Sequence, residues 1–142
     1  MPTKLERLTA IAQEDLKIDQ DNLDNEIARI PHLFSKYLNM LSVERLRLKQ
    51  LENDLKVVRK QRWEIYTGKE QGTGDDFFPH KIIRGDVSIY IDADDKIQRA
   101  ELAVSLQKEI VFNIEKIVDH INRRGLNIKS MIDWKKFTNG SY

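Results

Sequence analysis

The chain has 142 residues, of which 33% are charged and 40% hydrophobic, with a mean hydropathy of −0.56 and a formal net charge of +1. This length suits a single domain, and the hydrophobic fraction is too high for a disordered chain. Cysteine is absent, which excludes disulfides and cysteine-bound metals. No segment approaches the ~20 consecutive apolar residues that a membrane-spanning helix needs.

The small net charge conceals four charged blocks. Residues 1–30 hold four basic and seven acidic side chains, a net −3, and residues 75–95 hold two basic and six acidic ones, a net −4. Residues 55–69 and residues 123–136 each hold five basic side chains and one acidic one, a net +4. Because local fields select binding partners, the two basic blocks are candidate sites for an anionic ligand.

Residues 3–16 carry apolar side chains at helical spacing and predict a short amphipathic helix. From residue 23 to 66 a heptad pattern predicts one long helix, roughly 65 Å at 1.5 Å per residue. Ten of its twelve seam positions are apolar or aromatic. The seam consists of Ile27, Ile30, Phe34, Tyr37, Leu41, Glu44, Leu48, Leu51, Leu55, Val58, Arg62 and Ile65. We expect such a helix to need a partner, either another segment of the chain or another copy.

Two features mark the limits of this helix. Pro31 either opens the main helix at its first turn or kinks it after Ile30. Thr67 and Gly68 end it.

The second half of the chain predicts a connection and then further helices. Residues 69–80 read as a flexible connection, and residues 81–91 could form a small β-hairpin around a Gly-Asp turn. A second long helix starts at the sequence "DADDK", with carboxylates as caps, and ends near Arg124 because Gly125 follows. Residues 128–138 predict a short closing helix.

We therefore expect a mostly α protein with a single helical domain over residues 1–142. Residues 1–68 would form the N-terminal helix and the long coiled-coil-like helix, residues 69–95 a linker or hairpin, and residues 96–142 the C-terminal helices. Catalytic motifs are missing from the sequence. Its three histidines are scattered, and "TGKEQGTG" lacks the order of a phosphate-binding loop. We expect no metal, no cofactor and no enzymatic activity.

The basic segment that ends the long helix is the candidate binding site. Lys49, Lys56 and Trp63 share one position of the heptad, with Arg59 and Lys60 beside it, so these five side chains line one side of the helix. Cations and an aromatic ring are what a site for single-stranded nucleic acid requires. The alternative is a solvated face whose charges complement the helix dipole. Arg62 occupies a seam position, which favours a seam that opens there onto solvent or a ligand.

The sequence resembles the UvsY family of recombination mediators from T-even-like phages. The similarity is collinear over the chain and can be followed in "EDLKID", "LFSKYLN", "KVVRKQRWEIYTG" and "INRRGLNIKSMIDW". The family's basic motif is matched residue by residue by Lys60, Arg62, Tyr66, Thr67 and Gly68. The sequence departs from the family by having Ile65 in place of a second aromatic residue, and by having Pro31.

The resemblance implies a protein that binds single-stranded DNA and helps a RecA-like recombinase replace the phage single-strand binding protein. It implies contacts with both proteins, a ring of six or seven subunits, and action in the cytoplasm of the infected bacterial host in recombination, repair and recombination-dependent replication. Lys60 and Arg62 would contact DNA, together with Tyr66 of the motif, and the helix pattern adds Lys56, Arg59, Trp63 and Lys69. The alternative is a coiled-coil scaffold that binds only proteins.

Overall fold

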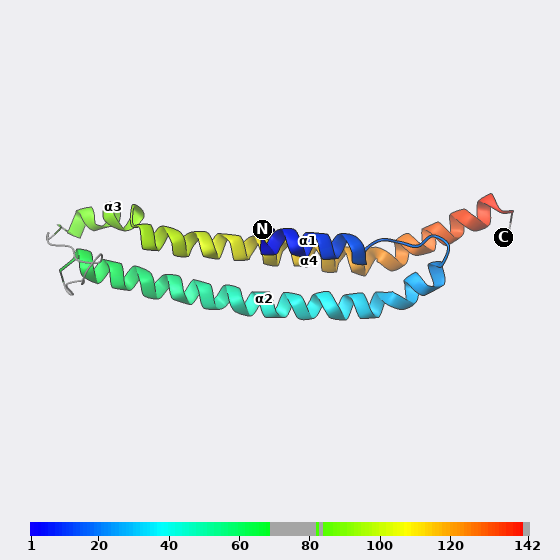
Figure 1. Ribbon diagram of the computed structural model, residues 1–142, viewed down its shortest axis with the longest axis horizontal. Helices are drawn as coiled ribbons and strands as arrows, with labels where there is room; N and C mark the ends of the chain where they lie inside the picture. The colour runs from blue at the N-terminus through cyan, green and yellow to red at the C-terminus, as the bar shows by residue number, and fades with distance from the viewer. Residues whose placement is uncertain (69–81, 83, 141–142) are drawn as a thin grey trace. The chain divides into compact units, whose positions relative to one another are not determined.

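The computed structural model describes residues 1–68, 82 and 84–140. In chain order these residues form helix α1 (Lys4–Asp15), helix α2 (Leu23–Tyr66), a 3₁₀ turn η2 (Arg84–Asp86), helix α3 (Val87–Asp92) and helix α4 (Asp95–Thr138) (Figure 1). This part of the chain contains no strand, so the mostly α fold class is confirmed. Contacts group the chain into unit 1 (Met1–Arg45 with Glu109–Tyr142) and unit 2 (Leu46–Lys108). Helices α2 and α4 each contribute to both units.

Helix α1 begins at a complete capping box. The Thr3 hydroxyl accepts from the backbone N–H of Glu6 at 3.1 Å, and the Glu6 carboxylate accepts from the backbone N–H of Thr3 at 2.8 Å. Two donors that a helix start leaves unpaired are thereby satisfied. Leu8 and Ala12 are buried on the inner face of α1, as the apolar spacing predicts, whereas Ile11 is 46% exposed.

The core of unit 1 lies between the first half of α2 and the second half of α4. Tyr37, Ile114, Ile121 and Ile128 have no exposed surface. The Tyr37 hydroxyl nevertheless has a partner, because it donates to the Asp15 carboxylate at 2.7 Å across to the end of α1. The predicted seam is therefore the packing face, and its partner within unit 1 is the chain's own second long helix.

The start of α2 corrects two sequence-based details. Pro31 lies inside the helix, eight residues after Leu23, so it does not open the helix. The first turns of α2 are inclined to the turns that follow (Figure 1), as expected where proline removes a backbone hydrogen bond. Ile27, assigned to the seam, is 43% exposed, while Glu26 is buried. Both residues fit helical spacing, and Glu26 faces inward because arginine donors hold its carboxylate.

Those donors come from Arg124 of α4 and Arg29 of α2. Arg124 is fully buried and donates to Glu26 Oε2 at 2.8 Å, and to the backbone oxygens of Leu16 and Lys17 at 2.9 and 3.1 Å. Arg29 donates to both oxygens of Glu26 at 3.0 and 3.1 Å. Arg124 thus ties the C-terminal end of α1 to α2 and α4.

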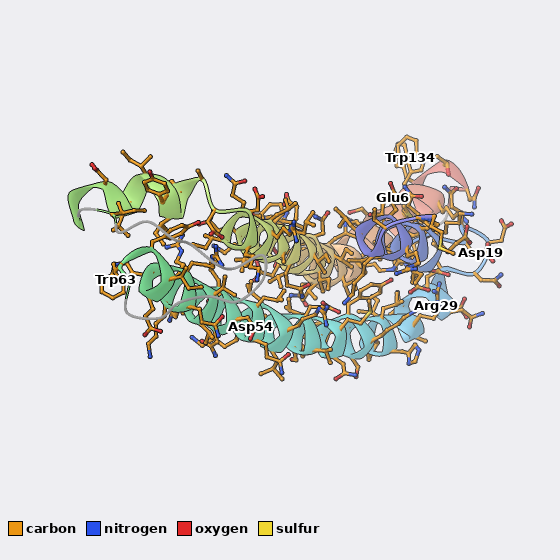
Figure 2. All side chains as sticks on the ribbon, turned by 60° about the vertical axis from the view of Figure 1, so that its left-hand side comes forward. Glu6, Asp19, Arg29, Asp54, Trp63 and Trp134 are labelled. Carbon is orange, nitrogen blue, oxygen red and sulfur yellow. The ribbon has the colours of Figure 1, made fainter. Side chains whose placement is uncertain are left out.

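The predicted helix end at Gly125 is wrong. Helix α4 continues through Gly125 to Thr138, so residues 128–138 are its last turns and do not form a separate helix. A glycine ends a helix by adopting a positive φ, and Gly125 does not adopt one. The last turns of α4 expose two aromatic rings. Trp134 projects outward (Figure 2) and stacks on Phe137 with the ring centroids 5.8 Å apart.

Unit 2 contains the second half of α2, the turn η2, helix α3 and the start of α4. Its buried side chains include Ile65, Val87, Ile97 and Val104. The predicted hairpin over residues 81–91 is wrong for residues 84–91, which form η2 and most of α3, and residues 81 and 83 lie outside the described part. Helix α2 ends where predicted, because Gly68 adopts a φ of 78° directly after Thr67.

Candidate nucleic-acid interface

Three side chains predicted to bind DNA form what we call the basic face: Lys56, Lys60 and Trp63. They follow one another on α2 at spacings of four and three residues, so they lie on one side of the helix. Lys56 and Lys60 are exposed, and 77% of the Lys60 side chain is open to solvent. The Lys60 ammonium lies 3.9 Å from the Glu64 carboxylate, at the outer limit of an ion pair. These two ammonium groups can therefore approach a phosphate without displacing a buried partner.

Trp63 supplies the aromatic part of this face. Its side chain is half-buried and projects from the end of α2 (Figure 2). The indole is the aromatic group of this face, and stacking of bases on aromatic side chains is a common way to hold a single strand. Trp63 is followed by the turn that ends the helix, where the Thr67 hydroxyl donates to the Trp63 carbonyl oxygen at 2.8 Å.

Arg59 borders the basic face and has a partner across unit 2. Its guanidinium forms an ion pair with Glu101 of α4, and both side chains are about half exposed. An exposed ion pair contributes only about 0–1 kcal/mol to stability, because water and salt compete with it. Arg59 can thus exchange Glu101 for a phosphate at small cost.

Arg62 and Tyr66 lie on the opposite, packed side of α2. The Arg62 Nε donates to Asp94 Oδ2 at 2.7 Å, and the Tyr66 hydroxyl donates to the same oxygen at 2.6 Å. The side chains of Arg62 and Asp94 are only 12% and 3% exposed. Asp94 also caps α4, because its Oδ1 accepts from the backbone N–H of Ile97 at 3.0 Å. The seam position of Arg62 is therefore occupied by an ion pair with a buried carboxylate, which leaves little of the Arg62 side chain open to solvent.

The pKa shifts of this cluster follow from burial and hydrogen bonding. Burial raises the pKa of Asp94, but the hydrogen bonds from Tyr66, Ile97 and Arg62 outweigh it, so the pKa falls below its ordinary value of 3.8. Burial and the bond to Asp94 both raise the pKa of Tyr66. Burial lowers the pKa of Arg62, but its bonds to Tyr66 and Asp94 raise it by more, so the net change is an increase. The cluster therefore holds one guanidinium, one carboxylate and one neutral phenol at neutral pH.

Tyr66 has no exposed ring face for a base in this arrangement. It is 7% exposed, its ring packs against Tyr90 with centroids 5.7 Å apart, and the Arg62 guanidinium carbon lies 5.3 Å from its ring centre. Lys69, the remaining predicted contact, lies outside the described residues.

Comparison with known proteins decides the family. Residues 11–141 match the family described as recombination, repair and ssDNA binding protein UvsY. The chain belongs to the UvsY family. It is 27% identical over 137 residues to the recombination protein uvsY of Enterobacteria phage T4, and the match covers 96% of this chain and 98% of that protein.

Crystal structures of the bacteriophage T4 recombination mediator protein UvsY share this fold. One crystal form has a TM-score of 0.83 at 27% identity, with 95% of this chain and 99% of that chain covered. A second form has a TM-score of 0.82 at 26% identity, with 97% and 99% covered. The resemblance stated from the sequence is thus confirmed, and UvsY membership gives this chain a role in recombination.

Sequence reasoning about UvsY motifs missed Asp94 as part of the site. Two signals were available, since a charged residue at a seam position needs a buried counter-charge and the aspartates of "DADD" begin the partner helix. In the second basic block, Arg124 is a core residue of unit 1, while Arg123, Lys129 and Lys136 are exposed.

Among the described residues no three His, Asp or Glu side chains gather to hold a metal ion. None of the helices among those residues is apolar over a length that would cross a membrane.

Proposed function

We propose that this chain is a recombination mediator that binds single-stranded DNA and helps load a RecA-like recombinase onto DNA covered by single-strand binding protein. The observation that carries the proposal is the basic face on a member of the UvsY family: two exposed ammonium groups, with a tryptophan one turn away. Arg59 and Lys69 extend the proposed DNA-binding surface, and Arg62 and Tyr66 support it from the packed side of the helix. The activity is binding, with no bond made or broken.

The chemistry of the basic face suits a single strand better than a duplex. A single strand presents phosphates and unstacked bases together, so the lysines can neutralise the backbone while the indole stacks on a base. A duplex hides its base faces and offers only phosphates to the same groups. We therefore expect a preference for single strands and binding that weakens as salt rises.

Assembly of several subunits multiplies this weak site. We infer a homo-oligomeric ring of six or seven subunits, in which one DNA strand engages several copies of the basic face. Exposed apolar side chains in unit 2 support an assembly. They include Leu46, Val57, Leu102 and Leu106, each between 54% and 69% exposed. A strand held along such a ring is bent and partly withdrawn from the single-strand binding protein, so the recombinase can nucleate on it in the cytoplasm of the infected host.

The test compares two charge-matched double variants. Lys56→Ala/Lys60→Ala removes both ammonium groups of the basic face, and Lys17→Ala/Lys108→Ala removes two exposed ammonium groups elsewhere. Fluorescence anisotropy with a labelled oligothymidylate should show weaker binding for the first variant. Its plot of log K against log salt should be shallower by about 0.7 for each phosphate that the variant no longer neutralises. The second variant should bind like the wild type. An equal decrease in affinity for both variants would show that net charge alone drives binding.

A second readout addresses the mediator step. The ATPase of a RecA-like recombinase on oligonucleotide covered by single-strand binding protein should rise when the wild-type chain is added, and should rise less with Lys56→Ala/Lys60→Ala. A chain that binds single strands but leaves this ATPase unchanged would retain DNA binding without the mediator role. No binding at all would favour the protein-only scaffold.

A further inference from the structure

The buried cluster of Arg62, Tyr66 and Asp94 joins the end of α2 to the start of α4 in unit 2. A single oxygen, Asp94 Oδ2, accepts from the Arg62 Nε at 2.7 Å and from the Tyr66 hydroxyl at 2.6 Å. The other oxygen of Asp94 accepts from the backbone N–H of Ile97. One carboxylate thus binds two side chains of α2 and caps α4.

This arrangement leaves the Arg62 guanidinium in a poor position to contact DNA. Its side chain is 12% exposed, and its charge is compensated by a carboxylate that is 3% exposed. A phosphate that replaced Asp94 would leave that carboxylate buried and uncompensated beside the helix start. Breaking one side of a buried ion pair is strongly unfavourable for this reason.

Lys60, two residues earlier, is in the opposite situation. Residues two apart on an α-helix point about 160° away from each other around its axis. Because Arg62 faces α4, Lys60 faces away from it, and 77% of the Lys60 side chain is exposed. The contact of Arg62 with Asp94 therefore determines the direction in which Lys60 points. It also determines the direction of Trp63, the next residue after Arg62.

We propose a division of labour within the basic motif, resting on the DNA-binding function proposed above. Lys60 contacts phosphate. Arg62 is a positioning residue that, through Asp94 and with Tyr66, holds the last two turns of α2 so that Lys60 and Trp63 face the strand.

The salt dependence of single-strand binding separates the two roles. Anisotropy titrations of the full chain with labelled oligothymidylate, over a salt series, give a slope that counts phosphate contacts. Lys60→Ala should weaken binding and make the slope shallower by about 0.7 for each phosphate contact that is lost. Arg62→Gln should weaken binding several-fold with the slope unchanged. A slope change for Arg62→Gln equal to that of Lys60→Ala would overturn the proposal.

For Asp94→Asn, the positioning role and a direct phosphate contact by Arg62 predict opposite changes in DNA affinity. Asparagine still caps a helix but does not compensate a guanidinium, so the positioning role predicts several-fold weaker binding. It also predicts that Arg62→Gln/Asp94→Asn binds no more weakly than either single variant, because both changes break the same contact. If Arg62 contacted phosphate, Asp94→Asn would free its guanidinium, and binding would become tighter with a steeper slope.

Two milder variants keep the test decisive if the others unfold. Arg62→Lys retains the charge but not the planar fork of donors, so it should bind like Arg62→Gln, whereas a simple phosphate contact would be rescued. Tyr66→Phe removes only the hydroxyl on Asp94 and should weaken binding slightly with the slope unchanged. If the wild-type chain binds no single strand, the proposed function itself fails. If it binds and an Arg62 variant changes the slope, only this inference fails.

Discussion

Arg124→Ala should destabilise unit 1 severely, because the buried guanidinium has three partners on two other segments. It donates to Leu16 and Lys17 at the end of α1 and to Glu26 of α2, at 2.9, 3.1 and 2.8 Å. Hydrogen bonds to charged groups contribute about 1.5–3 kcal/mol each. Their full sum overstates the loss, because water can reach the partly exposed end of α1 and Glu26 keeps Arg29.

The expected loss is therefore about 3–5 kcal/mol, the usual cost of breaking a buried ion pair. Urea unfolding followed by circular dichroism at 222 nm, at fixed protein concentration, measures it. Arg123→Ala is the matched control, because Arg123 is the exposed neighbour on the same helix and its removal should change the free energy of unfolding by less than about 0.5 kcal/mol. A loss of stability for Arg124→Ala no larger than for Arg123→Ala would refute the reasoning that this guanidinium anchors α1.

Three further predictions concern stability. Gly125→Ala should raise the free energy of unfolding by about 0.5–1 kcal/mol, because Gly125 lies within α4, where alanine is more stable than glycine. The new Cβ would lie 3.9 Å from Ile30 Cδ1, an ordinary contact distance. Thermal or urea unfolding measures the change, and a lower stability would favour a helix end at Gly125. Tyr37→Phe should cost about 1 kcal/mol by urea titration, because it removes the hydroxyl that donates to Asp15; unchanged stability would mean that this bond does not contribute. The lowered pKa of Asp94 makes its contribution to stability fully present above its ordinary value of 3.8, and this contribution disappears as pH falls through the lower folded pKa. Unfolding of Asp94→Asn between pH 2 and pH 5 should therefore depend less on pH than unfolding of the wild type, and parallel profiles would contradict the assignment.

The long helices were predictable because their hydrophobic spacing extends over many turns. The packing face of α2 from Tyr37 to Ile65 follows the heptad pattern, and so does that of α4 from Ile97 to Ile121. The sequence-based predictions are wrong where the local sequence fits two structures equally well. Glu26 and Ile27 both fit the seam, and the choice depends on Arg124, which lies 98 residues away in the sequence.

The predicted end of α4 at Gly125 was wrong for a related reason. Gly125 follows two arginines, a combination typical of a helix end, but Arg124 is needed in the core and Ile128 continues the buried face. Tertiary packing therefore overrides a local signal worth only about 1 kcal/mol. The predicted hairpin is wrong for a similar reason, because Gly85 and Asp86 form a 3₁₀ turn that leads into α3.

For the candidate site, the sequence predicted a segment but not which of its side chains are exposed and which are packed. Lys56, Lys60 and Trp63 lie on one side of α2 as the helix pattern predicts. The pairing of Arg62 with Asp94 depends on which turn of α4 packs beside the end of α2, and no spacing within α2 contains that information. The structure thus separates the predicted residues into an exposed basic face and a largely buried cluster with Asp94.

Anisotropy of the wild-type chain with a labelled single-stranded oligonucleotide and with a duplex of equal length, at low and at moderate salt, tests the central claim most directly. The account predicts tighter binding to the single strand and a marked decrease in affinity as salt rises. Equal affinity for both forms, or no binding at micromolar protein with the oligomer intact, would contradict it.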